Sequence, residues 1–175
     1  MDAIHFILTG GTIEKSYDPL TEKPEFLCQS ILPDYLDRVI KAYPESNFEV
    51  VCQIDSFEMN DKIRANIVDA IKVAQANQVI IIHGTSTMAQ TAQYLSEHLK
   101  GIDKTVILTG AMIPLKEFAM SDGGFNLGYA IAQVQNTEAG VYVAMNARLF
   151  SANEVDKNVE IGRFEPRGEG KIYVT

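Results

Sequence analysis

Short apolar runs alternate with stretches of helical periodicity along most of the chain, and this alternation constrains the fold more than any other feature. Each apolar run has the length of a strand and is too short for a buried helix. The runs are Ile4–Leu8, Phe48–Ile54, Val79–Ile82, Thr105–Leu108 and Val141–Met145. Helical periodicity occupies 31–43, 60–74, 88–99 and 122–134. Alternating strands and helices predict an α/β three-layer sandwich, in which a mostly parallel, doubly wound sheet carries helices on both faces.

Three polar residues stand where these helices are expected to begin. Asn60 can cap the second helix, and Thr87 can cap the third, with Gln90 completing a capping box. Asp122 is expected to cap the fourth helix. In the stretch 31–43, the residues predicted to share one buried helical face are Leu32, Tyr35, Leu36, Val39 and Ile40.

Composition narrows the class of protein. A chain of 175 residues with 46% hydrophobic content can bury one core, so we expect a single domain over 1–175. No apolar run approaches the roughly 20 residues that span a bilayer, and no signal peptide is evident, which predicts a cytoplasmic protein. The net charge of −8 disfavours attachment to nucleic acid or to an anionic membrane. Cys28 and Cys52 are expected to be buried free thiols.

Two hydroxyl-rich loops follow the first and third apolar runs. They read Thr9-Gly10-Gly11-Thr12 and His83-Gly84-Thr85-Ser86-Thr87. In a parallel sheet, loops at the carboxyl ends of strands converge on one crevice, so both loops can face one ligand. This arrangement indicates chemistry by hydroxyl groups that needs no metal.

The common cofactor motifs are missing. Gly10-Gly11 lacks the spacing of a dinucleotide-binding turn, and Gly84-Thr85-Ser86 lacks the lysine of a P-loop. The three histidines are scattered, and no zinc-binding pattern or serine nucleophile elbow is present. His83 follows a buried strand, which favours a hydrogen-bonded core histidine over a general base.

Several short motifs together resemble the bacterial asparaginase/glutaminase family. The resemblance covers nearly the whole chain and corresponds to the larger, amino-terminal domain of that family, a Rossmann-like or flavodoxin-like fold. Short single-domain relatives exist within the family. The matching motifs are Thr9-Gly10-Gly11-Thr12-Ile13, Asp55-Ser56-x-x-Met59, His83-Gly84-Thr85-x-Thr87-Met88, Thr109-Gly110-Ala111-Met112, Asp122-Gly123-x-x-Asn126-Leu127 and Met145-Asn146.

The resemblance implies cofactor-free hydrolysis of a side-chain amide through an acyl-enzyme, with release of ammonia. Thr12 matches the nucleophile, and Tyr17 matches a tyrosine that assists its deprotonation. Thr85 and Lys157 match a pair that arranges water and supports proton transfer. Because burial lowers the pKa of a lysine, Lys157 can serve as a proton acceptor. An exposed loop tyrosine and a solvated lysine are the simpler alternatives for Tyr17 and Lys157.

The resemblance also implies the contacts to substrate. Ser56 matches the residue that holds the substrate α-carboxylate, and the backbone amides of the Gly11 turn are oxyanion donors. Two positions depart from the family pattern, because Ser86 replaces an aspartate that anchors the α-ammonium, and Phe57 replaces a glutamine. Ser86 is as compatible with a structural role as with ligand contact.

Three consequences of Ser86 stay open at the level of sequence. Another acid, such as Glu58, Glu14 or Glu25, could replace the missing carboxylate, or the substrate could lack a free α-ammonium. Alternatively, the protein could bind an amide without turnover. Our leading hypothesis is an amidohydrolase for a small-molecule amide, in a homo-oligomer. Its competitors are a binding protein and a subunit that feeds ammonia to a partner.

Overall fold

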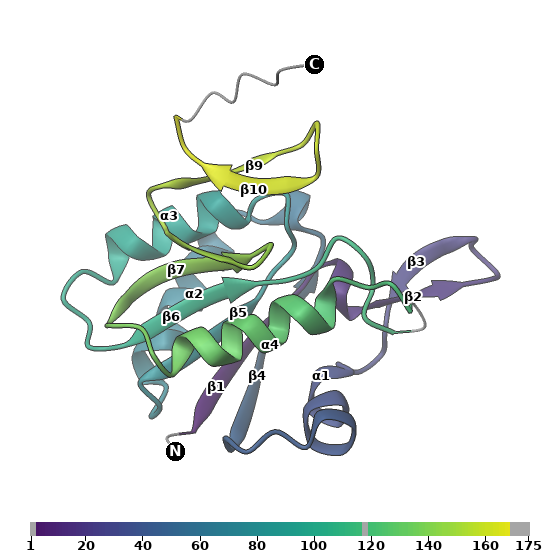
Figure 1. The fold of residues 1–175 in the computed structure, drawn as a ribbon, viewed down its shortest axis with the longest axis horizontal. Coiled ribbons are helices and arrows are strands. Elements are labelled where there is room, and N and C mark those ends of the chain that lie inside the picture. The colour runs from purple at the N-terminus through teal and green to yellow at the C-terminus, as the bar shows by residue number, and fades with distance from the viewer. Residues whose placement is uncertain (1–2, 117–118, 169–175) are drawn as a thin grey trace.

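The computed structural model describes residues 3–116 and 119–168, and a six-stranded sheet lies at its centre (Figure 1). The strand order is β4-β1-β5-β6-β7-β8. The first five of these strands are parallel, and β8 pairs antiparallel with β7 at one edge. The strands are β1 (Ile4–Gly10), β4 (Ser46–Ile54), β5 (Gln78–Ile82), β6 (Thr105–Thr109), β7 (Gly140–Met145) and β8 (Arg148–Ser151).

The order of the five parallel strands is that of a flavodoxin-like doubly wound sheet, which confirms the predicted fold class. Helices cover both faces of the sheet (Figure 1). One face is covered by α2 (Asp61–Val73) and α3 (Met88–His98), and the other by α1 (Leu32–Asp34), the π-helix η2 (Tyr35–Ile40) and α4 (Gly123–Val134).

The sheet separates two hydrophobic cores. Ile81 of β5 packs in one core with Ile67 of α2, and its neighbour Ile80 packs in the other core with Leu36 and Leu127. Adjacent residues of a strand point to opposite faces, so a continuous apolar run serves both cores at once.

The expectation of one regular α-helix over 31–43 is wrong. A single turn of α1 leads directly into the wider winding of η2, which ends at Lys41 with a positive φ of 54°. Only Leu32 and Leu36 are buried, while Val39 is 68% and Ile40 is 50% exposed. A π-helix advances fewer degrees per residue than an α-helix, so the spacing that predicts one buried face no longer applies.

The predicted helix starts have different outcomes. Asn60 caps α2 as expected, because its side-chain oxygen accepts a hydrogen bond from the Ile63 amide at 3.2 Å. Thr87 precedes α3 but makes no capping hydrogen bond, and its hydroxyl donates to the Ser56 carbonyl oxygen at 2.7 Å. The Thr87 hydroxyl, which the sequence predicts to cap α3, therefore bonds instead to the Ser56 carbonyl oxygen, because that carbonyl needs a hydrogen-bond partner.

Two antiparallel hairpins lie outside the central sheet (Figure 1). The first, β2 (Lys15–Asp18) with β3 (Lys23–Phe26), projects from the body of the molecule. The second, β9 (Val155–Asn158) with β10 (Arg163–Pro166), lies beyond α3 and β7. Two short 3-10 turns complete the described elements, η1 (Thr12–Glu14) and η3 (Ser56–Glu58).

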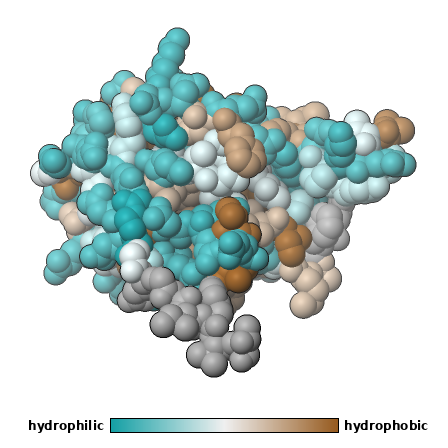
Figure 2. Space-filling model, turned by 90° about the horizontal axis from the view of Figure 1, so that it is seen from above, coloured by the Kyte–Doolittle hydropathy of each residue, from teal (hydrophilic) through white to brown (hydrophobic). Residues whose placement is uncertain are grey.

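The surface agrees with the acidic composition. Seen from above, it is mainly hydrophilic and carries a few small hydrophobic clusters (Figure 2).

Cys28 and Cys52 are free, but Cys28 is exposed and Cys52 is only partly buried, so the expectation that both are buried is wrong. Over 3–116 and 119–168, no helix is long and apolar enough to cross a membrane.

Candidate active site

The two hydroxyl loops meet at the carboxyl ends of β1 and β5, which are neighbours in the sheet. Ligands of doubly wound sheets bind at this point, where connections diverge to opposite faces. Gly11 has φ 85° and ψ 175°, a conformation open to glycine alone. A Cβ on Gly11 would lie 2.6 Å from the Gly84 Cα, so the two backbones are in direct contact. Glycine at both positions therefore brings the loops together.

Thr85 and Lys157 form a hydrogen-bonded pair. The Lys157 ammonium donates to Thr85 Oγ1 at 2.8 Å, across 72 positions of sequence. Thr85 is buried, and its own hydroxyl donates to Met112 Sδ at 3.4 Å, a weak acceptor. Burial lowers the pKa of Lys157 below its ordinary value. Within the described residues, no carboxylate pairs with Lys157.

A third loop, which follows β4, joins the same site through Ser56. Ser56 is buried, and its Oγ accepts a hydrogen bond from the Ser86 amide at 3.2 Å. A Cβ on Gly84 would lie 2.7 Å from the Ser56 Cβ, so this loop also packs closely. The turn holds its shape by a capping box between Asp55 and Glu58. The Ser56–Ser86 and Thr85–Lys157 hydrogen bonds thus lie next to each other, joined through the backbone of Thr85 and Ser86, and these four residues form the hydroxyl network of the site.

Thr12 and Tyr17 lie on the segment that leaves this network. Thr12 is partly buried at the start of η1, and its hydroxyl makes no hydrogen bond among the described residues. Tyr17 lies on the projecting hairpin, is 46% exposed and is likewise without a hydrogen bond there. Lys15 fixes the base of this hairpin to the third loop through an ion pair with Asp55 at 2.9 Å. In this conformation, the structure does not bring Tyr17 into the network.

Phe57 extends from the third loop into solvent and is 83% exposed. Its position beside Ser56 leaves an apolar side chain at the rim of the site. The sequence gives no reason for this exposure, because an aromatic residue next to a buried serine is compatible with either environment.

None of the three acids considered as a replacement carboxylate is free beside Ser86. The Glu58 carboxylate accepts from the Asp55 amide at 3.2 Å within the capping box. Glu25 is exposed on β3 of the projecting hairpin. Glu14 is buried and lines a separate cavity under the sheet edge. Among the described residues, the hydrogen-bond partners around Ser86 and Lys157 are hydroxyl and backbone groups, and no carboxylate is one of them.

His83 behaves as the expected core histidine. It is fully buried, and its Nδ1 lies 2.7 Å from the Gly84 carbonyl oxygen. Burial lowers the pKa of His83 to about 4, so the ring is neutral at pH 7. Since the ring has no access to solvent, a role as general base is not supported by this geometry.

A polar network that sequence reasoning missed positions the second hairpin. The Asn146 amide donates to Asn126 Oδ1 at 3.3 Å, and Asn146 Oδ1 accepts from the Phe164 amide at 2.9 Å. Asn126 is buried, and its side-chain nitrogen donates to an Asp122 oxygen at 3.0 Å. Asp122, Asn126 and Asn146 all stand in motifs that the chain shares with the asparaginase/glutaminase family, and this was the only sign in the sequence that they have a common role. They tie α4 and β7 to β10, the partner of the strand that carries Lys157.

The prediction that Asp122 caps α4 is wrong. Its carboxylate makes no capping hydrogen bond and instead accepts from the amides of Met112 and Ile113, each at 3.0 Å. These two amide donors belong to the loop after β6, and because they need acceptors, the carboxylate bonds to them and not to the amides at the start of α4. This contact holds Met112 next to Thr85.

Comparison with known proteins identifies relatives for this architecture. Residues 3–163 match the family described as "Asparaginase, N-terminal". The Glutaminase-asparaginase of Acinetobacter glutaminasificans is 32% identical over 168 residues, which cover 89% of this chain and 49% of that protein. The probable periplasmic L-asparaginase of Haemophilus influenzae is 33% identical and covers 88% of this chain and 46% of that protein.

Solved structures give the same result. The crystal structure of the probable cytoplasmic L-asparaginase from Campylobacter jejuni superposes with a TM-score of 0.79 at 32% identity. The match covers 97% of this chain and 54% of that chain. The chain thus spans about half the length of the relatives that it matches.

Proposed function

Because this chain belongs to the asparaginase family and matches its amino-terminal domain, we propose that it is an amidohydrolase that releases ammonia from a small carboxylic amide. The observation that carries this proposal is the 2.8 Å contact between Lys157 Nζ and Thr85 Oγ1, at the edge where Gly11 holds the loop of Thr12 against Gly84. A hydroxyl nucleophile needs a neighbouring group that accepts its proton. This edge of the sheet contains threonine hydroxyls and the amine of Lys157, so it offers both kinds of group.

In the first step, Thr12 Oγ1 attacks the amide carbon and the carbonyl electrons move onto oxygen. Tyr17 accepts the hydroxyl proton, which requires the β2–β3 hairpin to bring Tyr17 closer to Thr12. Backbone amides of the Gly11 turn and of the Thr85 loop stabilise the oxyanion. As the tetrahedral intermediate collapses, Tyr17 gives this proton to the amide nitrogen, the carbon–nitrogen bond breaks, and ammonia leaves with an ester formed on Thr12.

In the second step, water attacks the ester carbon beside Thr85. Burial lowers the pKa of Lys157 and so raises the fraction of neutral amine, which accepts the water's proton through Thr85 and then returns a proton to Thr12 Oγ1 as the ester bond breaks. The Met112 sulfur competes weakly for the Thr85 proton, so the hydroxyl is free to reorient towards water.

We propose that Ser56 and Ser86 contact the carboxylate side of the substrate. Lys157 is the one cation that hydrogen-bonds within the described network, and the nearby carboxylates of Asp55 and Glu58 bond elsewhere, to Lys15 and to the Asp55 amide. Among the described residues, no carboxylate hydrogen-bonds to Ser86 or Lys157 to receive a substrate ammonium, while the exposed ring of Phe57 offers an apolar rim. The site therefore favours an amide whose α-amine is blocked or missing over asparagine itself.

The test is ammonia release from asparagine, glutamine, N-acetylasparagine and succinamate. We expect the last two to be hydrolysed faster, with loss of activity in Thr12→Ala and none in the matched control Thr21→Ala, at an exposed position. Activity that survives Thr12→Ala would refute the nucleophile.

The observation that favours a second candidate is the missing anion beside Ser86, since a binding protein can lose turnover and keep its pocket. That candidate predicts saturable binding of N-acetylasparagine in calorimetry without ammonia release, and gain of asparagine hydrolysis in Ser86→Asp.

We further propose that the protein is a single domain over 1–175, forms a homo-oligomer in the cytoplasm and needs no cofactor. One relative carries a cytoplasmic description and another a periplasmic one, so location is tested by fractionation of cells. Sedimentation velocity tests assembly. The charge of −8 supports a small-molecule partner rather than nucleic acid.

A further inference from the structure

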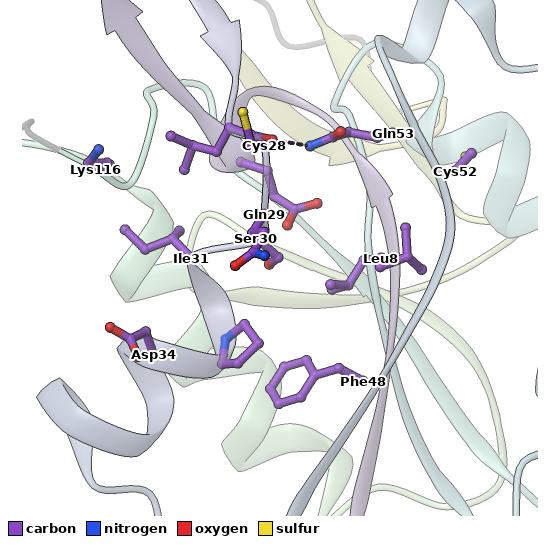
Figure 3. A pocket seen from close by; sticks show the side chains of 14 residues that line it. Leu8, Cys28, Gln29, Ser30, Ile31, Asp34, Phe48, Cys52, Gln53 and Lys116 are labelled. Atoms are coloured by element: carbon purple, nitrogen blue, oxygen red, sulfur yellow. Dashed lines mark hydrogen bonds between the residues drawn. The ribbon is translucent and has the colours of Figure 1, made fainter.

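A large cavity separate from the hydroxyl network lies on the α1 side of the sheet edge (Figure 3). Its volume is about 800 Å³, within the range of small-molecule sites. Its floor comes from Leu8 at the end of β1 and from Phe48 and Cys52 of β4. The opposite wall comes from the segment between β3 and η2, through Leu27, Cys28, Gln29, Ser30, Ile31, Pro33 and Asp34. None of Thr12, Ser56, Thr85 and Lys157 lines it.

The lining of this cavity is mixed, since apolar side chains stand beside the charged side chains of Asp34 and Lys116, and it includes one buried acid. Glu14 lines the cavity, is only 2% exposed, and its Oε1 has no hydrogen-bond partner among the described residues. Burial raises the pKa of Glu14, an effect that Ser30 and the Gly10 backbone partly oppose. The pKa of Cys52 in the cavity floor is raised to about 11, first by burial and then by the charge of Glu14.

The combination of walls and acid selects a ligand class. An unpartnered carboxylate oxygen in an apolar environment is costly, and a cationic donor offsets this cost best. The apolar part of the lining favours a hydrocarbon body, and the two acids of the lining, Glu14 and Asp34, outnumber its one cation, Lys116, so the cavity favours a cationic ligand over an anionic one. We propose that the cavity is a second binding site, which takes a small primary ammonium ion with an apolar body and holds its nitrogen on Glu14 Oε1.

Calorimetry with hexylammonium, 1-hexanol and hexanoate tests this inference on the full chain. We expect hexylammonium to bind saturably with one site, at least about tenfold more tightly than hexanol, and hexanoate not to bind. Glu14→Gln should weaken hexylammonium binding at least about tenfold. Glu25→Gln removes the same charge from an exposed position and should leave binding unchanged.

Two further variants distinguish the cavity from the proposed amidohydrolase site. Val50→Lys places a competing ammonium at the cavity wall and should abolish hexylammonium binding. Thr12→Ala should retain binding in full, whether or not the protein releases ammonia. Absence of saturable binding, equal affinity for hexanol, or unchanged affinity in a Glu14→Gln protein with a cooperative thermal transition would overturn the inference.

Discussion

Replacement of Gly11 by alanine tests the contact that joins the two hydroxyl loops. The backbone of Gly11, at φ 85° and ψ 175°, costs any other residue about 1–3 kcal/mol. The added Cβ would also lie 2.6 Å from two backbone atoms of Gly84, and such overpacking costs about 1–3 kcal/mol more. Together these terms lower the free energy of unfolding by about 2–6 kcal/mol, a large fraction of the stability of a typical domain.

Urea denaturation followed by circular dichroism measures this loss. With a slope of about 2 kcal/mol per molar urea, the Gly11→Ala midpoint should fall by about 1–3 M. Gly128→Ala is the matched control, because Gly128 lies in α4 and an added Cβ there meets nothing within 4 Å. That substitution should raise stability by about 0.5–1 kcal/mol. A Gly11→Ala midpoint equal to that of the wild type would refute the close approach of the loops.

Three other measurements test separate parts of the structure. Lys157→Met should lower ammonia release at least about 100-fold, whereas Lys62→Met, at an exposed position of α2, should leave it unchanged. Between pH 6.5 and about 4 the unfolded chain protonates His83 and the folded chain does not, so the free energy of unfolding should fall as pH falls, by up to about 3 kcal/mol. Urea titrations should show a smaller fall in His83→Gln but not in His98→Gln, where the ring is exposed. Asn60→Ala should lower the thermal midpoint by removing a cap of about 1 kcal/mol.

The central strands were predictable because they are buried on both faces. A run such as Val79–Ile82 leaves few alternatives to a strand inside a covered sheet. The order of the strands was not predictable from the pattern, since apolar runs do not specify their neighbours. The winding of 35–40 was equally hidden, because an α-helix and a π-helix both suit its residues until tertiary packing selects one.

The site was predictable in its location and less so in its contacts. Loops at the ends of parallel strands must converge, which placed Thr12 and Thr85 at one edge. The contact between Thr85 and Lys157 was expected from family resemblance alone, as no local pattern links residues 72 positions apart. Thr87 and Asp122 were assigned to helix caps because local rules consider only adjacent donors. Tertiary partners for both come from other loops. The catalytic and binding roles of the site residues stay predictions.

The hairpin that carries Lys157 gives the contact between Lys157 and Thr85 a stability of its own. Among the residues that the structure describes, strands β9 and β10 pair with each other alone, and Val155 and Phe164 are their buried residues in the core. Detaching this unit exposes two apolar side chains, at about 1.5–3 kcal/mol each, while the six-stranded sheet stays paired. Synthesis also completes β1 to β8 before Lys157 can reach Thr85. A fully formed sheet can thus precede, and outlast, the contact between Lys157 and Thr85, so a folded molecule can lack that contact.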